Sequence, residues 1–587
     1  MKKISLFVAA LALTIVAFAE PIIGMSGTYK IGAAEVPPNY SSLKAATDAL
    51  NSLGMSGDVV FEISSDLLET ASSRIGVDTK TFSLTIRPDS DMDRKIEFNM
   101  AADNAKASGL IIIGLSADSW ENLSSTTQNV TIDGFANGFS TRRLTLATTD
   151  AANIYHGPIQ IVGNSKFITV KNCLLTQRNL TSGSSTYAIR IRVEQNAALT
   201  AFRPSDITIE NNVITAVKNN AQMGIGLTFA TGIAVTNTIK NVIIKNNEIY
   251  ARTRGVSMSN NEDIVISKNI FSTEQPNAGM LSTWIQGISN GAGKVTLNAN
   301  KFISGLTGNS TAGAYGFRGI IASGGGTWYI DNNFFTGLRT TAAPAAVGGL
   351  TDMLVIRCGN TCLIRNNTFL LNALNANVNL APTYQAINIA AGTPEIRNNI
   401  FISNEDAVAN TLISGAVGGI TDYNIYYLKA GIVNARINST FATFADYRTA
   451  NPTMDIHSKN VDVNFVNATD LSLTGLSLQD GNLAVPRLAD VLTDINGISR
   501  AETTYAGAHE ALLPFLYSST DNVMQTASIK HTATGIEVVL DGQATIEIYS
   551  INGMLIDKTN TNGSYTRDLK NGMYIIRING KATKFIK

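Results

Sequence analysis

The chain is poor in cysteine, in tryptophan and in charge of either sign. Its 587 residues include three cysteines and three tryptophans, and charged residues make up 15% of the total. Three cysteines are too few for a disulfide-rich scaffold. Lysine plus arginine number 45, as do aspartate plus glutamate, so no excess charge indicates a nucleic acid or an acidic membrane as partner.

The only apolar run long enough to suggest membrane insertion lies at the start of the chain. Residues 1–3 are Met-Lys-Lys, Ile4–Phe18 is almost wholly apolar, and small residues stand at Ala17 and Ala19. This order is typical of a signal peptide, and we expect cleavage after Ala19, which leaves no membrane span. A buried N-terminal helix is the alternative interpretation. The sequence therefore predicts an exported protein.

One phrase, Ile-x-Asn-Asn-x-[Ile/Phe], returns throughout the middle of the chain. It begins at Ile209, Ile244, Ile330, Ile364 and Ile396, and looser copies lie at 170–173, 267–270, 298–302 and 422–425. The last asparagines of the copies are Asn172, Asn212, Asn247, Asn269, Asn300, Asn333, Asn367, Asn399 and Asn424, in steps of 22 to 40 residues. A self-similar unit of this length predicts a solenoid.

Each repeat has the pattern of short strands joined by a sharp bend. Alternating apolar residues such as Ile207 and Ile209 indicate strands with every second side chain inward. Asparagine tolerates the left-handed backbone of a bend, and stacked asparagine amides form a hydrogen-bonded ladder. A third strand precedes each motif, at Ala188–Val193, Gly224–Thr228, Gly255–Met258, Gly319–Ala322, Met353–Ile356 and Ala386–Ile389. A leucine-rich repeat needs a Leu-x-x-Leu-x-Leu frame that is absent here, and a helical repeat lacks this period of two.

These asparagine-bearing repeats resemble the right-handed parallel β-helix of the pectate-lyase superfamily over roughly residues 80 to 470. The resemblance implies an all-β solenoid. It also implies an N-terminal helical cap, matched by Lys44–Leu53, and a closing segment, matched by residues 464–510, in which His509 is structural. It does not imply one activity, because the fold carries lyases, hydrolases, epimerases, adhesins and inert surface proteins.

The last part of the chain reads as a small separate β-sandwich. An Asn552-Gly553 hairpin turn joins two alternating segments, and a second turn leads into Gly572-Met573-Tyr574. This module resembles the sorting domain of type IX secretion substrates, with Asn571 where the family usually has Pro or Ser. The resemblance implies the type IX machinery as a partner and a secreted or outer-membrane surface location. An immunoglobulin-like spacer is the alternative.

Five segments follow from these patterns: a signal peptide at 1–19, a cap and first coil at 20–80, a parallel β-helix with its closing segment at 81–511, a linker at 512–520, and the sorting β-sandwich at 521–587.

Signatures of catalysis are missing from the chain. The paired carboxylates of a polygalacturonase are absent, and His156 in His156-Gly157-Pro158 reads as a loop residue. No carboxylate cluster is evident that would hold calcium, so we predict no metal or cofactor. Cys173 reads as an inward-facing apolar residue. Cys358 and Cys362, four residues apart, either close a disulfide or are separately buried.

The best candidate site is cationic. Inward Ile189, Ile191 and Val193 leave the outer positions to Arg190, Arg192 and Glu194, and Arg252 and Arg254 flank a strand about two coils further on. Arginines on neighbouring coils can bind a uronate carboxylate in a bidentate way. Solvated charges paired along the sheet are the alternative. Trp284, Trp328, Tyr187 and Tyr315 are candidates either for stacking on sugars or for packing.

Two functional classes remain open. The first is an exported β-helix protein that binds a polysaccharide or surface glycan, or mediates adhesion, without catalysis. The second is a polysaccharide lyase that cleaves a uronate-containing glycan by β-elimination. The missing carboxylate cluster favours the first.

Overall fold

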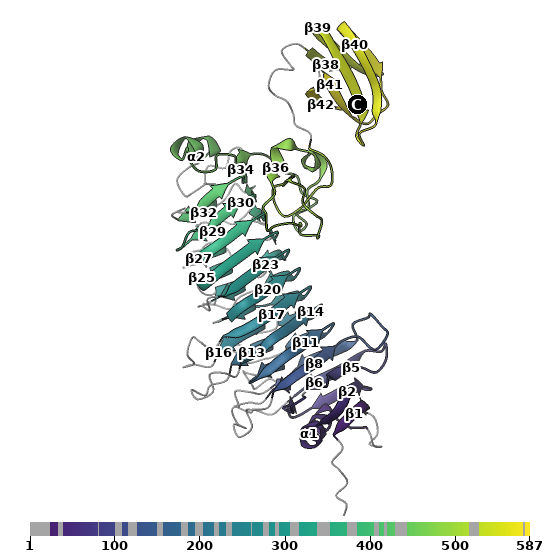
Figure 1. Cartoon of the computed structure of the whole chain (residues 1–587), viewed down its shortest axis with the longest axis vertical. Helices are drawn as coiled ribbons and strands as arrows, with labels where there is room; N and C mark the ends of the chain where they lie inside the picture. Colours follow the sequence, from purple (N-terminus) through teal and green to yellow (C-terminus); the bar gives the residue numbers. More distant parts are fainter. Residues whose placement is uncertain are drawn as a thin grey trace, which may run out of the picture.

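The structure of the chain is a computed structural model. It describes residues 24–32, 39–79, 81–99, 109–114, 126–149, 157–177, 186–193, 203–216, 222–229, 238–259, 261–273, 281–287, 293–305, 316–336, 353–371, 384–403, 410–415, 419–428, 443–515, 527–578 and 581–587. The fold is a right-handed parallel β-helix, as the repeat predicts. Strands stack as coils along one axis (Figure 1), and each strand pairs in parallel with its equivalent in the next coil.

Each coil has three faces, which we name in chain order. The first face ends at the asparagine bend and holds β2 Met55–Ile63, β5 Leu84–Pro88, β8 Thr127–Asp133, β11 Ser165–Lys171, β14 Ser205–Glu210, β17 Ile239–Lys245, β20 Asn261–Ser267, β23 Lys294–Asn298, β30 Glu395–Arg397 and β33 Ile420–Asp422. β1 Met25–Ile31 pairs with β2 at the N-terminal end of this face.

The second face follows the bend and is a 13-stranded parallel sheet. Its strands are β3 Leu67–Glu69, β6 Arg94–Phe98, β9 Leu144–Thr148, β12 Leu174–Gln177, β15 Val213–Ala216, β18 Glu248–Ala251, β21 Ile270–Thr273, β24 Lys301–Gly305, β26 Phe334–Phe335, β28 Thr368–Leu371, β31 Ile400–Ser403, β34 Ile425–Leu428 and β35 Lys459–Asn460.

The third face completes the coil and contains all six predicted third strands. It holds β4 Ser73–Ile75, β7 Gly109–Ile113, β10 Gly157–Val162, β13 Thr186–Val193, β16 Gln222–Phe229, β19 Arg254–Met258, β22 Leu281–Gly287, β29 Tyr384–Ile389 and β32 Asn410–Gly415. Two longer strands, β25 Gly316–Asp331 and β27 Met353–Arg365, start on the third face and continue around the corner onto the first face of the next coil.

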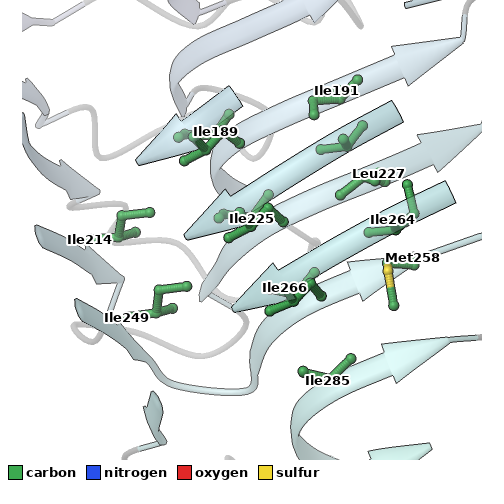
Figure 2. Close-up of a cluster of buried hydrophobic side chains, with 14 of the residues drawn as sticks. Ile189, Ile191, Ile214, Ile225, Leu227, Ile249, Met258, Ile264, Ile266 and Ile285 are labelled. Atoms are coloured by element: carbon green, nitrogen blue, oxygen red, sulfur yellow. The ribbon is translucent and has the colours of Figure 1, made fainter. Parts of the chain in front are cut away.

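The interior is filled by the alternating apolar residues. Figure 2 shows Ile189, Ile191, Ile225 and Leu227 pointing inward from the third face, with Ile214 and Ile249 from the second. Further along, the interior contains a stack of rings spaced 4.7 to 5.4 Å between neighbours: Phe271, Phe302, Phe335, Phe369, Phe401 and Tyr426. In-register stacking lets identical positions of successive coils bury the same kind of surface.

An asparagine ladder runs along the bend between the first and second faces. Each ladder side-chain oxygen accepts bonds from the backbone N–H and the amide of the preceding ladder asparagine, at 2.9 to 3.1 Å; the members are Asn212, Asn247, Asn269, Asn300, Asn333, Asn367, Asn399 and Asn424. Their side chains are buried. The ladder therefore satisfies polar groups at a bend that excludes water.

The prediction that Asn172 belongs to this ladder is wrong by one residue. Asn172 has φ 61° and takes the left-handed bend position that Asn211 takes in the next coil. Cys173 occupies the ladder position, and its N–H donates to Asn212 Oδ1 at 2.9 Å. In this coil the asparagine stands at the bend, whereas Lys268, Ala299 and Tyr423 take the bend in coils whose ladder asparagine follows. Asn172 instead contacts Asp133 and Asn211.

Helices cover both ends of the solenoid. At the N-terminal end, α1 Leu43–Leu53 begins at Ser42, whose side chain accepts from the Ala45 N–H, and its apolar side packs on the first coils. At the other end, α2 Phe444–Ala450 places Tyr447 beyond the ring stack. Tyr447 and Tyr426 both donate to the buried Asp455 carboxylate. Burial raises the pKa of Asp455, against the hydrogen bonds that it accepts.

The closing segment, residues 461–515, folds back along the second face. It contains η3 Gly475–Leu478, η4 Gly481–Leu483, β36 Ala484–Pro486 and β37 Thr503–Tyr505. Its apolar side chains form a second core with outward residues of the last coils, among them Phe334, Leu370, Ile400, Ile402 and Ile425. His509 is partly buried here and accepts from the Leu473 N–H, in keeping with the structural role implied for it.

The residues after the closing segment form an antiparallel sheet. Its strands are β38 Ala527–His531, β39 Gly535–Ser550, β40 Leu555–Asp568, β41 Met573–Ile578 and β42 Lys581–Ile586. The predicted hairpin turn lies between β39 and β40, where Gly553 has φ 80°. This sheet has its own apolar core. None of the helices within the described ranges is long and apolar enough to cross a membrane.

Candidate functional site

The outward positions of the third face carry the predicted arginines. Ile189 and Ile191 point into the interior (Figure 2), so Arg190 and Arg192 between and after them face outward. In register, Arg190 is level with Gly226 of β16 and, one coil further on, with Ser257 of β19. Arg254 occupies the neighbouring outward column, which passes through Tyr187 two coils earlier.

The Tyr187 ring lies beside Arg190 and over Gly226. A Cβ on Gly226 would lie 2.4 Å from the Tyr187 ring, so the ring covers the outer side of Gly226 and requires glycine there. The Arg190 guanidinium lies 5.7 Å from the same ring centroid, within cation–π range. Arg190 Nε also donates to Thr228 Oγ1 at 3.1 Å. The ring and the guanidinium are thus held in fixed positions on the outer surface.

The surroundings of Arg254 shift its pKa. Burial lowers its pKa, and the nearby Tyr187 opposes the shift. Within the described parts of the chain, Arg254 makes no ion pair with a carboxylate. A guanidinium that is partly removed from water is stabilised by an anion, which it can bind through two parallel hydrogen bonds.

Two further arginines extend the face, and the sequence interpretation missed them. Arg318 of β25 lies in the Arg254 column, level with Leu354. Arg357 of β27 lies in the Arg190 column, level with Ile321. Arg357 directly follows the inward Ile356, so counting alternate positions would have found it. Arg318 lies two residues before the inward Ile320, so alternation alone would place it inward. We name Arg190, Arg192, Arg254, Arg318 and Arg357 the arginine face.

The described outward positions of the arginine-face columns contain no carboxylate. Besides the arginines and Tyr187, their polar side chains include Gln160, Ser257, Gln286, Gln385, Asn388 and Ser414. The first face differs, because its cations alternate with acids. Lys171 pairs with Asp133, Lys245 with Glu210 and Arg365 with Asp331, at 2.7 to 3.2 Å between neighbouring coils. Positive charge on the first face is therefore paired with acids of neighbouring coils.

The other predicted candidates lie elsewhere. Arg252 lies in the corner between β18 and β19 and not in an outward column. Trp284 and Trp328 are core residues, so their role is packing: Trp284 lies against Phe302 and Phe335. Arg192 is 6% exposed, which does not fit a solvated charge. Glu194, His156 and Tyr315 lie outside the described residues.

The described residues contain no group of three or more histidines, cysteines or acids that could hold a metal ion. Cys173 is fully buried, and burial raises the pKa of its thiol. It is therefore an inert packing residue and not a nucleophile.

No family model matches the chain, and no curated protein sequence matches it. Solved structures are similar at low identity. DFA-IIIase from Arthrobacter chlorophenolicus A6, crystallised without its lid, is 13% identical over 70% of this chain and 99% of its own, with a TM-score of 0.39. PfbA, a surface adhesin of Streptococcus pneumoniae, is 14% identical over 68% and 84%, with a TM-score of 0.31. A GH136 lacto-N-biosidase from Eubacterium ramulus is 11% identical over 74% and 66%, with a TM-score of 0.32.

Proposed function

We propose that the chain is an exported β-helix protein that binds an acidic polysaccharide on its arginine face. The observation that carries the proposal is Arg254, a partly buried arginine that lies in register with Tyr187 and makes no ion pair with a carboxylate among the described residues. Elsewhere on the solenoid, cations are paired across coils. A ligand with regularly spaced carboxylates or sulfates would supply an anion to Arg254.

The geometry of the face favours a linear ligand. Neighbouring coils are about 4.8 Å apart, and Arg190, Arg254 and Arg318 occur on alternate coils of two adjoining columns. Anionic groups would thus be bound about 10 Å apart along the axis. Among the described residues, the outward side chains of this face offer no general acid–base pair of carboxylates, so the proposal is binding without hydrolysis.

Arg254→Ala is expected to weaken binding to an acidic polysaccharide by roughly tenfold or more, because a charge-assisted hydrogen-bonding group is lost. The measurement is calorimetric titration with polygalacturonate, alginate and heparin, and with dextran as the neutral polymer. Lys245→Ala is the matched control, since Lys245 is paired with Glu210 on the first face.

Equal loss of affinity in both variants, or equal binding to dextran, would overturn the proposal. Ultraviolet absorbance is followed in the same samples, with and without calcium. Absorbance from an unsaturated uronate product would identify a polysaccharide lyase and replace the non-catalytic function.

We also propose that residues 521–587 direct the protein to the cell surface by type IX secretion, after export by the signal peptide at 1–19. An independent apolar core in the final sheet supports a separately folded module. Its Gly572-Met573-Tyr574 strand start is the motif on which the resemblance to sorting domains depends.

Removal of residues 521–587 is expected to leave the β-helix in the periplasm of a host with the type IX machine, whereas the full chain reaches the surface. Cell fractionation and surface protease accessibility measure the difference. The control is a Tyr549→Phe variant of the full chain, which keeps the sheet. Surface delivery of the truncated chain would contradict the sorting role.

A further inference from the structure

Cys358 and Cys362 lie on either side of a corner in β27. The strand leaves the third face after Cys358, turns through residues 359–361, and enters the first face at Cys362. Both side chains are fully buried in the solenoid core. In register they are level with Ala322 and Trp328 of the preceding coil. The two cysteines therefore face the same interior corner from adjoining faces.

Both cysteines are free thiols, and their side chains interact across the corner. Cys358 Sγ donates to the carbonyl oxygen of Asn360 at 3.0 Å. The interaction with Cys362 lowers the pKa of Cys358 against the effect of burial, whereas the same interaction and burial raise the pKa of Cys362.

The backbone of the corner is held in place by its neighbours. Asn360 Nδ2 donates to the carbonyl oxygen of Gly326 in the preceding coil at 2.6 Å. The carbonyl oxygen of Cys358 accepts from the N–H groups of Ala390 and Ala391 in the following coil. A corner fixed from both sides keeps the two sulfurs together without strain in a long loop.

We propose that Cys358 and Cys362 form an intramolecular disulfide in the mature protein, an inference that rests on the proposed export. The thiolate of one cysteine attacks a disulfide of a protein oxidant and displaces one of its thiolates. The thiolate of the other cysteine then attacks the mixed disulfide and displaces the second. Two protons leave the pair, and its two electrons reduce the oxidant's disulfide to a dithiol. Burial of both sulfurs places this exchange before the coil closes.

The disulfide would join the third face of one coil to the first face of the next, at the end of the arginine face. Arg357, which belongs to that face, directly precedes Cys358. The covalent link would hold the corner beside Arg357 when the surrounding strands fluctuate.

Thiol counting tests the proposal, because Cys173 provides an internal reference. The full chain is purified from an oxidising periplasm, denatured, and alkylated with and without prior reduction. One alkylated cysteine is expected without reductant and all three with it. Mass spectrometry of peptides should then place the first label on Cys173. In Cys358→Ser and in Cys362→Ser, two cysteines should be labelled without reductant.

Three labels without reductant, or a dimer that reductant separates, would overturn the disulfide. The same count is made on protein purified from a reducing cytosol, unfolded, and refolded in an oxidised glutathione buffer. This sample reports on the cysteine pair whether or not the chain is exported. If the refolded sample takes one label but the protein in its native host is found inside the cell, the proposed export is contradicted. The disulfide chemistry of the cysteine pair is then still supported.

Discussion

Replacing Asn300 with alanine is expected to lower the free energy of unfolding by about 3–5 kcal/mol. Asn300 lies in the middle of the ladder and is fully buried. Its amide donates to the Ile266 carbonyl oxygen and to Asn333 Oδ1, and its oxygen accepts two bonds from Asn269. Alanine removes these bonds and leaves their buried partners without water to replace them.

The matched control is Asn246→Gly. Asn246 precedes a ladder asparagine, is exposed, and has φ 56°. Glycine adopts that backbone readily, so the loss should be below about 1 kcal/mol. Chemical unfolding gives the stability, and hydrogen exchange at the Ile266 and Asn269 amides reports locally, because a solenoid need not unfold in one step. Similar losses in the two variants would show that the amide ladder contributes little.

The solenoid could be predicted from sequence because its strongest constraints are local. A bend with positive φ selects asparagine, and alternation selects isoleucine for the interior, so both leave a periodic trace. The single error in the ladder arose because the asparagine of this coil stands one position earlier, at the bend, and Cys173 takes the ladder position. Counting asparagines could not distinguish the two positions, whereas counting from the inward Val170 would have done so.

The candidate site was predicted only in part, because outward residues obey no comparable constraint. Arg190 was found from alternation and Arg254 from its place beside a predicted strand, but their relation to Tyr187 depends on the register between coils separated by loops of variable length. Trp284 and Trp328 illustrate the converse. Large rings near a strand end suit either a sugar platform or a core, and only the stacking against Phe302 identifies packing.

The hydrophobic pattern of the second-face strands indicates where the closing segment lies, and the sequence interpretation did not use it. In the earlier coils, second-face strands alternate, as in Val213-Ile214-Thr215. In the later coils, Phe369-Leu370-Leu371 and Ile400-Phe401-Ile402 are continuously apolar. A strand that is apolar on both sides is buried on both sides. These runs therefore indicate that something covers the second face there, and the structure identifies the cover as residues 461–515.

The buried side chain of Arg500 holds the closing segment against the second face. The Arg500 side chain is fully buried, and its guanidinium donates to Asn332 Oδ1 at 2.8 Å and to the Gly507 carbonyl oxygen at 2.8 Å. It also contacts the buried Glu510 carboxylate. Burial lowers the pKa of Arg500 to about 10, against the effect of Glu510, so the side chain stays charged at neutral pH. Gly507, with φ 81°, contacts Thr368 so closely that a Cβ would lie 2.7 Å from its Oγ1.

Replacing Arg500 with methionine should therefore detach the closing segment, at a cost of about 3–5 kcal/mol, because it leaves the Glu510 carboxylate buried and unpaired. Limited proteolysis should cut within 461–515, and a dye that binds apolar surface should report the uncovered Leu370, Ile400 and Ile402. Arg487→Ala is the control, since Arg487 is exposed and gives one bond to the Arg500 carbonyl oxygen. If Arg500→Met resists protease as well as the control does, apolar packing alone holds the cover, and the buried ion pair contributes specificity of position instead of stability.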